Sequence, residues 1–273
     1  MPKQLTPAQS EQYAHDGFTG PVPVLTADEA RSFRDELEAY ERSAGKVIGF
    51  PERSKSYLLF GWADAIVHHP RVLDAVEDVI GPNILAYHTT LWVKEAHAEM
   101  FTLWHQDDAY FFLDPAEQVT AWVALSEASV QAGCMRMIPG SHREGLAEHT
   151  DSPSRGNIIR RGRAIHDRFD DSDGVLVPLR AGEMSLHNTH TIHSSGANKS
   201  DDRRIGLGIS YIPTRVCSRV ETRSSALLVR GVDEYRHFHP EERLRQPLSA
   251  EARAQHARAY DFYMKSAKIP EGA

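Results

Sequence analysis

The feature that most constrains the fold is a change of hydrophobic period at Pro82. After this residue, apolar and polar side chains alternate over short segments, which is typical of strands with two unlike faces. Turn-forming residues separate these segments. The predicted strands occupy residues 83–94, 99–105, 118–126, 134–139, 174–179, 183–193 and 204–212. Because no regular helices alternate with them, the pattern predicts a mostly β fold, a sandwich or a barrel, and argues against a doubly wound sheet.

Helical signals flank this region. Thr6 is an expected N-cap, and Thr26 with Glu29 forms a capping box that begins a second helix. A third helix is expected over roughly residues 70–80, where Gly81-Pro82 ends it. We therefore expect residues 1–82 to be mainly helical, residues 83–215 to form the β core with a long polar loop at 141–173, and residues 216–273 to form a C-terminal extension. With no linker in between, the prediction is a single domain over residues 1–273.

The composition argues against several classes of protein. The chain has 31 Lys and Arg against 38 Asp and Glu, a net charge of −7, whereas a dedicated nucleic-acid-binding protein normally has a basic face. No run approaches the ~18 uninterrupted apolar residues of a transmembrane helix, and the N-terminal residues lack the apolar stretch of a secretory signal. Cys134 and Cys217 cannot form a disulfide framework, so a cytoplasmic location is expected.

The 15 histidines become informative where they occur beside an acidic residue. His105 and Asp107 end a predicted strand, and on an extended strand residues i and i+2 face the same side, so both side chains can bind one ion. A third ligand is available from His187, His190 or His193. Two histidines and one carboxylate are the ligand set of non-haem Fe(II) oxygenases, and the absence of a nearby thiolate favours iron over structural zinc.

Arg204 begins a predicted strand on which its same-face neighbours are small: Gly206, Gly208 and Ser210. Small neighbours leave room beneath the guanidinium, where a carboxylate can bind in a bidentate manner. A surface ion pair is the alternative interpretation. Lys94, on another predicted strand, either contacts an anion as well or marks the edge of a sheet.

Several sequence blocks carry a resemblance to a known family. They are Trp104-His105-Gln106-Asp107, residues 119–125 (VTAWVAL), residues 133–142 (GCMRMIPGSH), residues 193–200 (HSSGANKS) followed by Arg203-Arg204, and Asp16-Gly17-Phe18 near the start. In this order the blocks resemble the phytanoyl-CoA dioxygenase (PhyH) family of Fe(II)/2-oxoglutarate-dependent oxygenases, over about residues 7–215. Gln131-Ala132 replaces the Glu-Asn that the family commonly has before Gly133, from which we expect a local change of loop.

The resemblance implies a double-stranded β-helix (jelly roll, cupin-like) flanked by α-helices, and it implies a set of site residues. Iron is assigned to His105, Asp107 and His193, which leaves His187 and His190 without a role. The residues implied to contact 2-oxoglutarate or to line its pocket are Arg204, Ser195, Thr102 and Trp122. The implied cofactors are Fe(II), 2-oxoglutarate as co-substrate and O2, with ascorbate as a supporting reductant.

The implied reaction is hydroxylation of an unactivated C–H bond, with conversion of 2-oxoglutarate to succinate and CO2. Related halogenases have Ala or Gly at the position of Asp107, so the carboxylate here disfavours halogenation. A non-catalytic metal-binding jelly roll and a 2-oxoglutarate-independent dioxygenase are the alternatives. Neither of them needs a carboxylate site at Arg204.

The substrate is expected to be a small molecule, and two features bear on its class. Aromatic residues near the expected site form either a box for a quaternary ammonium group or ordinary core: Tyr57, Trp62, Trp92, Tyr110, Phe111 and Phe112. Residues 155–168 contain five arginines against one aspartate. This loop either recruits an anionic substrate or is a solvated surface segment.

Overall fold

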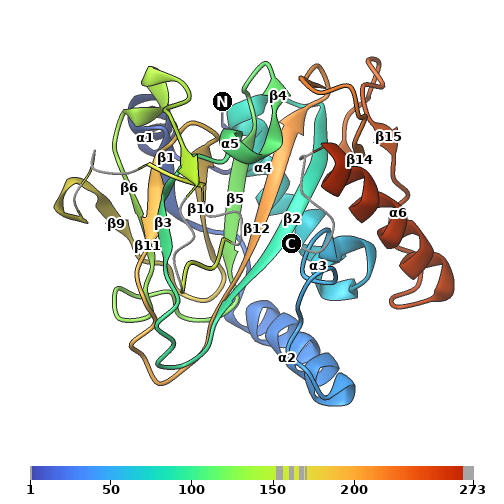
Figure 1. Cartoon of the computed structure of the whole chain (residues 1–273), viewed down its shortest axis with the longest axis horizontal. Helices are drawn as coiled ribbons and strands as arrows, with labels where there is room; N and C mark the ends of the chain where they lie inside the picture. Colours follow the sequence, from blue (N-terminus) through green and yellow to red (C-terminus); the bar gives the residue numbers. More distant parts are fainter. Residues whose placement is uncertain (1, 152–155, 160–162, 166–168, 170, 267–273) are drawn as a thin grey trace.

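The computed structural model describes residues 2–151, 156–159, 163–165, 169 and 171–266. Within these residues, two main sheets form (Figure 1). The larger has seven strands in the order β1 (Phe18–Pro23), β10 (Glu183–Asn188), β5 (Val119–Ala124), β12 (Arg204–Pro213), β2 (Ile84–Lys94), β14 (Ser225–Arg230) and β15 (His239–Pro240). The smaller has four, in the order β3 (Thr102–His105), β11 (His193–Ser195), β6 (Met135–Met137) and β9 (Val175–Val177). Short pairs join β4 (Leu113–Asp114) to β13 (Cys217–Ser218) and β7 (Thr150–Asp151) to β8 (Arg163–Ala164).

The three helices predicted from the sequence begin where it predicts them. Thr6 and Thr26 both form complete capping boxes, at the starts of α1 (Pro7–Asp16) and α2 (Ala27–Ala44). The helix expected over 70–80 is α4 (Pro70–Ile80), which ends at Gly81. The remaining helices are α3 (Gly61–Val67), α5 (Asp108–Phe111), α6 (Ala250–Ser266) and the 3₁₀ turns η1 (Ser56–Leu58), η2 (Ser141–Glu144) and η3 (Asp171–Asp173). Among the described residues, no helix has both the length and the apolar character needed to cross a membrane.

The main core lies between the helices and the outer face of the larger sheet. On β12, Ile205, Leu207 and Ile209 point into this core together with residues of α3 and α4. The other face of the sheet points toward the smaller sheet, where Trp122 of β5 packs with Met135 of β6. The predicted alternation of faces is therefore confirmed, and the mostly antiparallel pair of sheets is a jelly roll. The space between the two sheets is where the candidate site lies.

Three strands of the larger sheet, β1, β14 and β15, lie outside the predicted β core. β1 falls in the region expected to be mainly helical, because the prolines of FTGPVP make it unlike a central strand. Proline removes a ladder donor, but β1 is an edge strand and tolerates the loss. β14 pairs with β2, and β15 pairs with β14, so the C-terminal extension contributes two strands of this sheet as well as the α6 helix.

A buried ion pair joins this extension to the body of the protein. Lys55, fully buried before η1, donates a 2.6 Å hydrogen bond to Glu241, which also accepts bonds from Tyr57 and Ser225. On α6, His256 donates a 2.8 Å bond from Nε2 to the carbonyl of Ser54. The His256 bond holds α6 against the segment before η1, and Figure 1 shows α6, in dark red, beside β14.

Candidate active site

Two strands of the smaller sheet place a pair of histidines side by side. His105, at the end of β3, is the register partner of His193, at the start of β11. In each ring Nδ1 donates a 2.9 Å hydrogen bond to the carbonyl two residues earlier, those of Leu103 and Thr191. These bonds fix the tautomer in which Nε2 is unprotonated. Both Nε2 atoms can therefore act as metal ligands.

Asp107 completes the group, but its backbone conformation differs from the expected one. The extended-strand geometry predicted for residues 105–107 is wrong: β3 ends at His105, and Asp107 has helical dihedral angles (φ −64°, ψ −34°) just before α5. The turn still brings Oδ1 of Asp107 to 3.9 Å from Nε2 of His105 and 3.9 Å from Nε2 of His193. The three ligand atoms all lie within 4.8 Å of one another, close enough to bind one metal ion.

The second carboxylate oxygen of Asp107 is held by the larger sheet. Thr120 of β5 donates a 2.6 Å hydrogen bond to Oδ2, and Nε2 of His187 on β10 lies 3.3 Å from the same atom. Thr120 and His187 are themselves register partners. His187, expected to have no role, therefore orients the carboxylate so that Oδ1 faces the histidines. His190 does not: it pairs with Asp108 at 3.1 Å.

Burial sets the protonation of the three candidate ligands. It lowers the pKa of His105 and of His193, which favours the neutral imidazole that binds a metal. Burial also opposes ionisation of Asp107, but the hydrogen bond from His187 and the adjacent histidines outweigh it and hold the pKa of this carboxyl below its usual range. The group thus presents two neutral nitrogens and one anionic oxygen.

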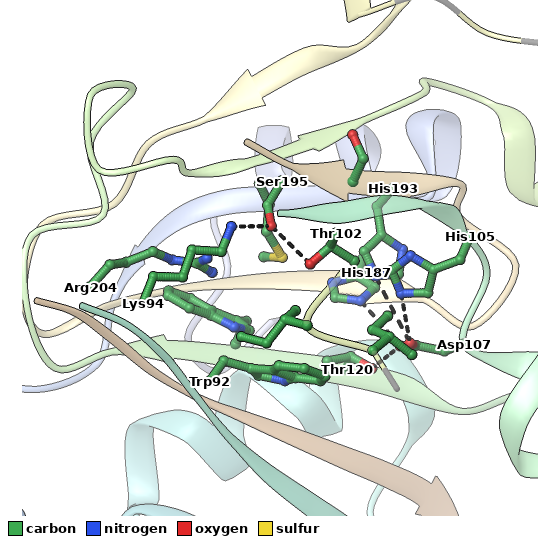
Figure 2. A pocket seen from close by; sticks show the side chains of 15 residues that line it. Trp92, Lys94, Thr102, His105, Asp107, Thr120, His187, His193, Ser195 and Arg204 are labelled. Carbon is green, nitrogen blue, oxygen red and sulfur yellow. Dashed lines mark hydrogen bonds and ion pairs between the residues drawn. The ribbon is translucent and has the colours of Figure 1, made fainter. Parts of the chain in front are cut away.

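The opposite end of the same cavity contains two buried basic residues (Figure 2). Arg204, which begins β12, and Lys94, which ends β2, are register partners and are 3% and 1% exposed. Burial lowers the pKa of Arg204 to about 10. Burial and the charge of Arg204 lower the pKa of Lys94 to about 6. Within the described part of the chain, no carboxylate forms an ion pair with either residue, and Nε of Arg204 has no hydrogen-bond partner.

A chain of hydroxyl groups extends from these basic residues toward the histidines. Lys94 donates from Nζ to Oγ of Ser195 at 2.7 Å and to the carbonyl of Gly196 at 2.5 Å. Ser195 in turn donates to Oγ1 of Thr102 at 3.1 Å. Figure 2 shows this chain between the basic end and the histidine end of the cavity.

The glycines of β12 make room for an indole ring instead of a carboxylate. The guanidinium carbon of Arg204 lies 4.6 Å from the centroid of Trp122. A Cβ atom at Gly206 would lie 1.8 Å from this indole, so only glycine is compatible with the stack. The space expected beneath the guanidinium is therefore filled, and an anion must approach Arg204 from the side that Trp122 leaves open.

All seven site residues named from the sequence line this one cavity of about 480 Å³: His105, Asp107, His193, Arg204, Ser195, Thr102 and Trp122. Thr120 was not foreseen, although the two-residue period of β5 puts it on the same face as Trp122. The sequence offers no comparable signal for His187. Its place on β10 opposite Thr120 follows from the pairing of the two strands, which only the structure shows.

The expectations about substrate contacts have mixed outcomes. Trp92 lines the cavity, while Tyr110 and Phe111 line an adjoining chamber. Tyr57 and Trp62 instead belong to the main core, which is the alternative interpretation of these aromatics. The arginine side chains of residues 155–168 lie outside the described residues, and from this loop Ile158 and Ile159 contact the cavity.

Comparison with known proteins gives a consistent result. The sequence profile described as phytanoyl-CoA dioxygenase (PhyH) matches residues 13–206. A probable alpha-ketoglutarate-dependent hypophosphite dioxygenase of Stutzerimonas stutzeri is 25% identical over 74% of this chain and 77% of its own length. The human peroxisomal phytanoyl-CoA dioxygenase is 31% identical over 70% of this chain, but the match spans only 56% of the human enzyme.

A solved structure extends the similarity to most of the fold. The non-heme monooxygenase ThoJ, in its apo form, is 34% identical, with a TM-score of 0.85 over 95% of this chain and 97% of that one. Its similarity therefore includes the C-terminal region, which lies beyond the segment matched by the family profile. From the profile match, which covers more than half of its residues, the chain belongs to the phytanoyl-CoA dioxygenase (PhyH) family.

Proposed function

We propose that the protein is an Fe(II)- and 2-oxoglutarate-dependent dioxygenase that hydroxylates a C–H bond of a small organic substrate. His105, Asp107 and His193 bind the iron, and Arg204 with Ser195 and Thr102 binds the far carboxylate of 2-oxoglutarate. One observation carries the proposal: a compact His-Asp-His group and a buried arginine without an acidic partner among the described residues share one cavity.

The residues present fit both groups. Two neutral imidazoles and one carboxylate match the ligand set of ferrous oxygenases and leave coordination positions for other ligands. At the other end, a buried guanidinium normally has an anionic partner, because burial of an unpaired charge is costly. A dicarboxylate fits between the two ends, since one carboxylate can reach the metal while the other pairs with Arg204.

Ferrous iron, together with 2-oxoglutarate and O2, supplies the oxidising power to hydroxylate a C–H bond, with release of succinate and CO2. The chain provides geometry and surroundings. Thr120 and His187 keep the carboxylate of Asp107 oriented, and the backbone carbonyls of β3 and β11 keep both imidazoles in one tautomer. Trp122 covers one face of Arg204 and excludes water from it, which strengthens its interaction with an anion.

Asp107 also separates two possible outcomes of this chemistry. A carboxylate ligand occupies the position that a halide needs, so hydroxylation is favoured over halogenation. Arg204 weighs against a non-catalytic metal-binding role and against a dioxygenase that does without 2-oxoglutarate. Neither role explains why the two basic side chains Arg204 and Lys94 are buried together. The name of the Stutzerimonas relative also includes dependence on alpha-ketoglutarate.

The proposal is tested by the affinity for 2-oxoglutarate. Loss of a buried charged partner typically costs about 2–5 kcal/mol, so Arg204→Leu should weaken 2-oxoglutarate binding about 30-fold or more. Titration calorimetry on the Mn(II)-loaded protein measures this without turnover. Arg31→Leu, which removes an exposed arginine of α2, is the matched control and should bind like the wild type. Wild-type affinity in Arg204→Leu, or no 2-oxoglutarate-dependent succinate formation by the Fe(II)-loaded wild type, would contradict the proposal.

A further inference from the structure

A second chamber adjoins the first at the end that contains the candidate iron ligands. The two share Trp92, His105 and Asp107, so a molecule in the second chamber lies next to the candidate iron ligands. Its walls come from β2, α5, the loop residues Ile158 and Ile159, and the helix α6. A substrate bound in this chamber would therefore be within reach of a metal held by these residues.

The lining of this chamber is unsuited to a charged group. Asp107 is the single acidic side chain among the described lining residues, and none of them is Lys or Arg. The carboxylate of Asp107 already has partners at both oxygens, because Oδ1 faces the histidines and Oδ2 accepts a hydrogen bond from Thr120. Among these described residues, a substrate anion or cation would therefore lose its hydration without gaining an ionic partner.

Three of the aromatic rings of the lining, those of Phe50, Trp92 and Tyr263, are poorly placed to favour a cation. Arg53, which does not line the chamber, places its guanidinium 5.0 Å from the ring centroids of both Phe50 and Trp92. Tyr263 stacks on His88 at 3.9 Å. These three rings already have a partner on one face, which reduces what they can offer to an ammonium group.

His88 lines the chamber and has one buried polar atom without a partner among the described residues. The residue is 3% exposed, and its Nε2 lies 3.2 Å from Oγ of Ser54. Its Nδ1 is buried and has no hydrogen-bond partner within the described residues. Burial keeps the ring neutral, because it holds the pKa of His88 well below its usual value. A buried polar atom of this kind is normally satisfied by a ligand or a water molecule.

The C-terminal helix forms one wall of the chamber. Ala252, His256 and Ala259 of α6 are buried, at helical spacing, against the body of the protein. This packing directs Tyr260, Tyr263 and Met264 to the chamber. The family profile ends at residue 206, so this wall is built from residues beyond the part that the chain shares with the family as a whole.

We propose that α6 encloses the part of the substrate that reaches the metal, and that this part is uncharged, mostly apolar and hydrogen-bonded to His88. The inference rests on the proposed function and adds a substrate class to it. It favours neither an anionic group nor a quaternary ammonium group in the chamber. The apolar rings accept a cyclic or aromatic body, and Nδ1 of His88 accepts or donates a single hydrogen bond according to its tautomer.

The test uses probes that share one skeleton and differ in charge. 3-Phenylpropanamide is neutral, 3-phenylpropanoate is anionic, 3-phenylpropylammonium is cationic and propylbenzene lacks the polar group. Each is titrated under nitrogen into the protein loaded with Mn(II) and 2-oxoglutarate. Paramagnetic relaxation of the probe protons reports binding near the metal, and the Zn(II)-loaded protein gives the diamagnetic reference. We expect the amide to bind at least tenfold more tightly than either charged probe.

Two variants assign the contacts. Met264→Trp fills the chamber from α6 and should weaken amide binding at least tenfold. Its matched control is Ala257→Trp, on the exposed face of the same helix, which should bind like the wild type. His88→Phe should remove most of the preference for the amide over propylbenzene, on the order of tenfold, while propylbenzene still binds.

The outcomes separate the inference from the proposed function. Failure of the wild type to bind Mn(II) or 2-oxoglutarate would count against the proposed function itself. With both bound, absence of amide relaxation, or a charged probe that binds as tightly as the amide, overturns the substrate class. Wild-type amide affinity in Met264→Trp overturns the role of α6. Retained preference for the amide in His88→Phe overturns the role of His88.

Discussion

The two ends of the cavity that we propose for 2-oxoglutarate differ in how their charged side chains are paired. At the metal end, the anionic side chain of Asp107 is fully engaged: one oxygen faces two histidines, and the other is held by Thr120 and His187. At the far end, Arg204 is buried against an indole without an acidic partner among the described residues. The charged group of the first end is therefore held in place by its neighbours, whereas the buried positive charge of the second end has no anionic partner among the described residues.

This difference indicates how binding energy is distributed. At the proposed metal end, hydrogen bonds already orient the candidate ligands His105, Asp107 and His193, so a metal ion would meet a formed site. At the far end, burial of Arg204 and Lys94 weakens the folded protein until an anion is bound. We therefore expect metal affinity to depend on hydrogen bonds that hold the ligands, and co-substrate affinity to depend on charge.

The largest effect is expected from the ligand carboxylate. Asp107→Asn keeps the shape of the side chain but removes its charge, so affinity for Fe(II) or Mn(II) should fall on the order of 100-fold or more. Asp108→Asn makes the same change one residue further, where the carboxylate pairs with His190 and Arg219, and should leave metal affinity intact. Calorimetric titration of both variants with Mn(II) measures the difference. Equal affinities would remove Asp107 from the ligand set.

A smaller effect is expected from the hydroxyl that orients this carboxylate. Thr120→Val removes the 2.6 Å hydrogen bond to Oδ2 of Asp107 at nearly constant volume, and loss of such a contact typically weakens metal binding about 10- to 100-fold. Thr19→Val removes another buried threonine hydroxyl, on the edge strand β1, as the control. Unchanged Mn(II) affinity in Thr120→Val would show that His187 alone suffices to hold the carboxylate.

Much of the fold could be predicted because period and capping are local signals. The capping boxes at Thr6 and Thr26 and the alternation of β12 depend on residues that are near neighbours in the chain. β1 was missed because its prolines are acceptable only at a sheet edge, and edge position is a property of the whole sheet.

The candidate site was predicted in part for the same reason. Six of the seven named residues lie in short motifs that resemble the family, Thr102 lies two residues before one of them, and the structure brings all seven into one cavity. Thr120 and His187 acquire their contact with Asp107 through the register of β5 and β10, which the sequence does not state. The stack of Trp122 on Arg204 likewise needs two strands to be adjacent, with glycine at position 206.

The smallest effect concerns Lys94, and its sign depends on pH. The pKa of this lysine is lowered to about 6 in the folded protein, against ~10.4 for an exposed lysine, because burial and Arg204 disfavour its charge. Between these values the unfolded chain binds a proton that the folded chain lacks. This group therefore makes the free energy of unfolding rise with pH across that window. Lys94→Met should remove this slope, so its stability relative to the wild type should be highest near pH 6 and fall toward pH 9.

An anion bound beside Arg204 and Lys94 should raise the lowered pKa of Lys94 again. By favouring charged Lys94, 2-oxoglutarate binding takes up a proton, so wild-type affinity should increase as the pH falls from 8 toward 6. Lys94→Met should bind a few-fold more weakly and with less pH dependence. Lys3→Met, which removes an exposed lysine, controls for net charge. Denaturant unfolding and 2-oxoglutarate titrations at several pH values measure both effects. If Lys94→Met kept the wild-type pH dependence of both stability and 2-oxoglutarate affinity, Lys94 would not be the group that causes it, and Arg204 alone would provide the unpaired positive charge.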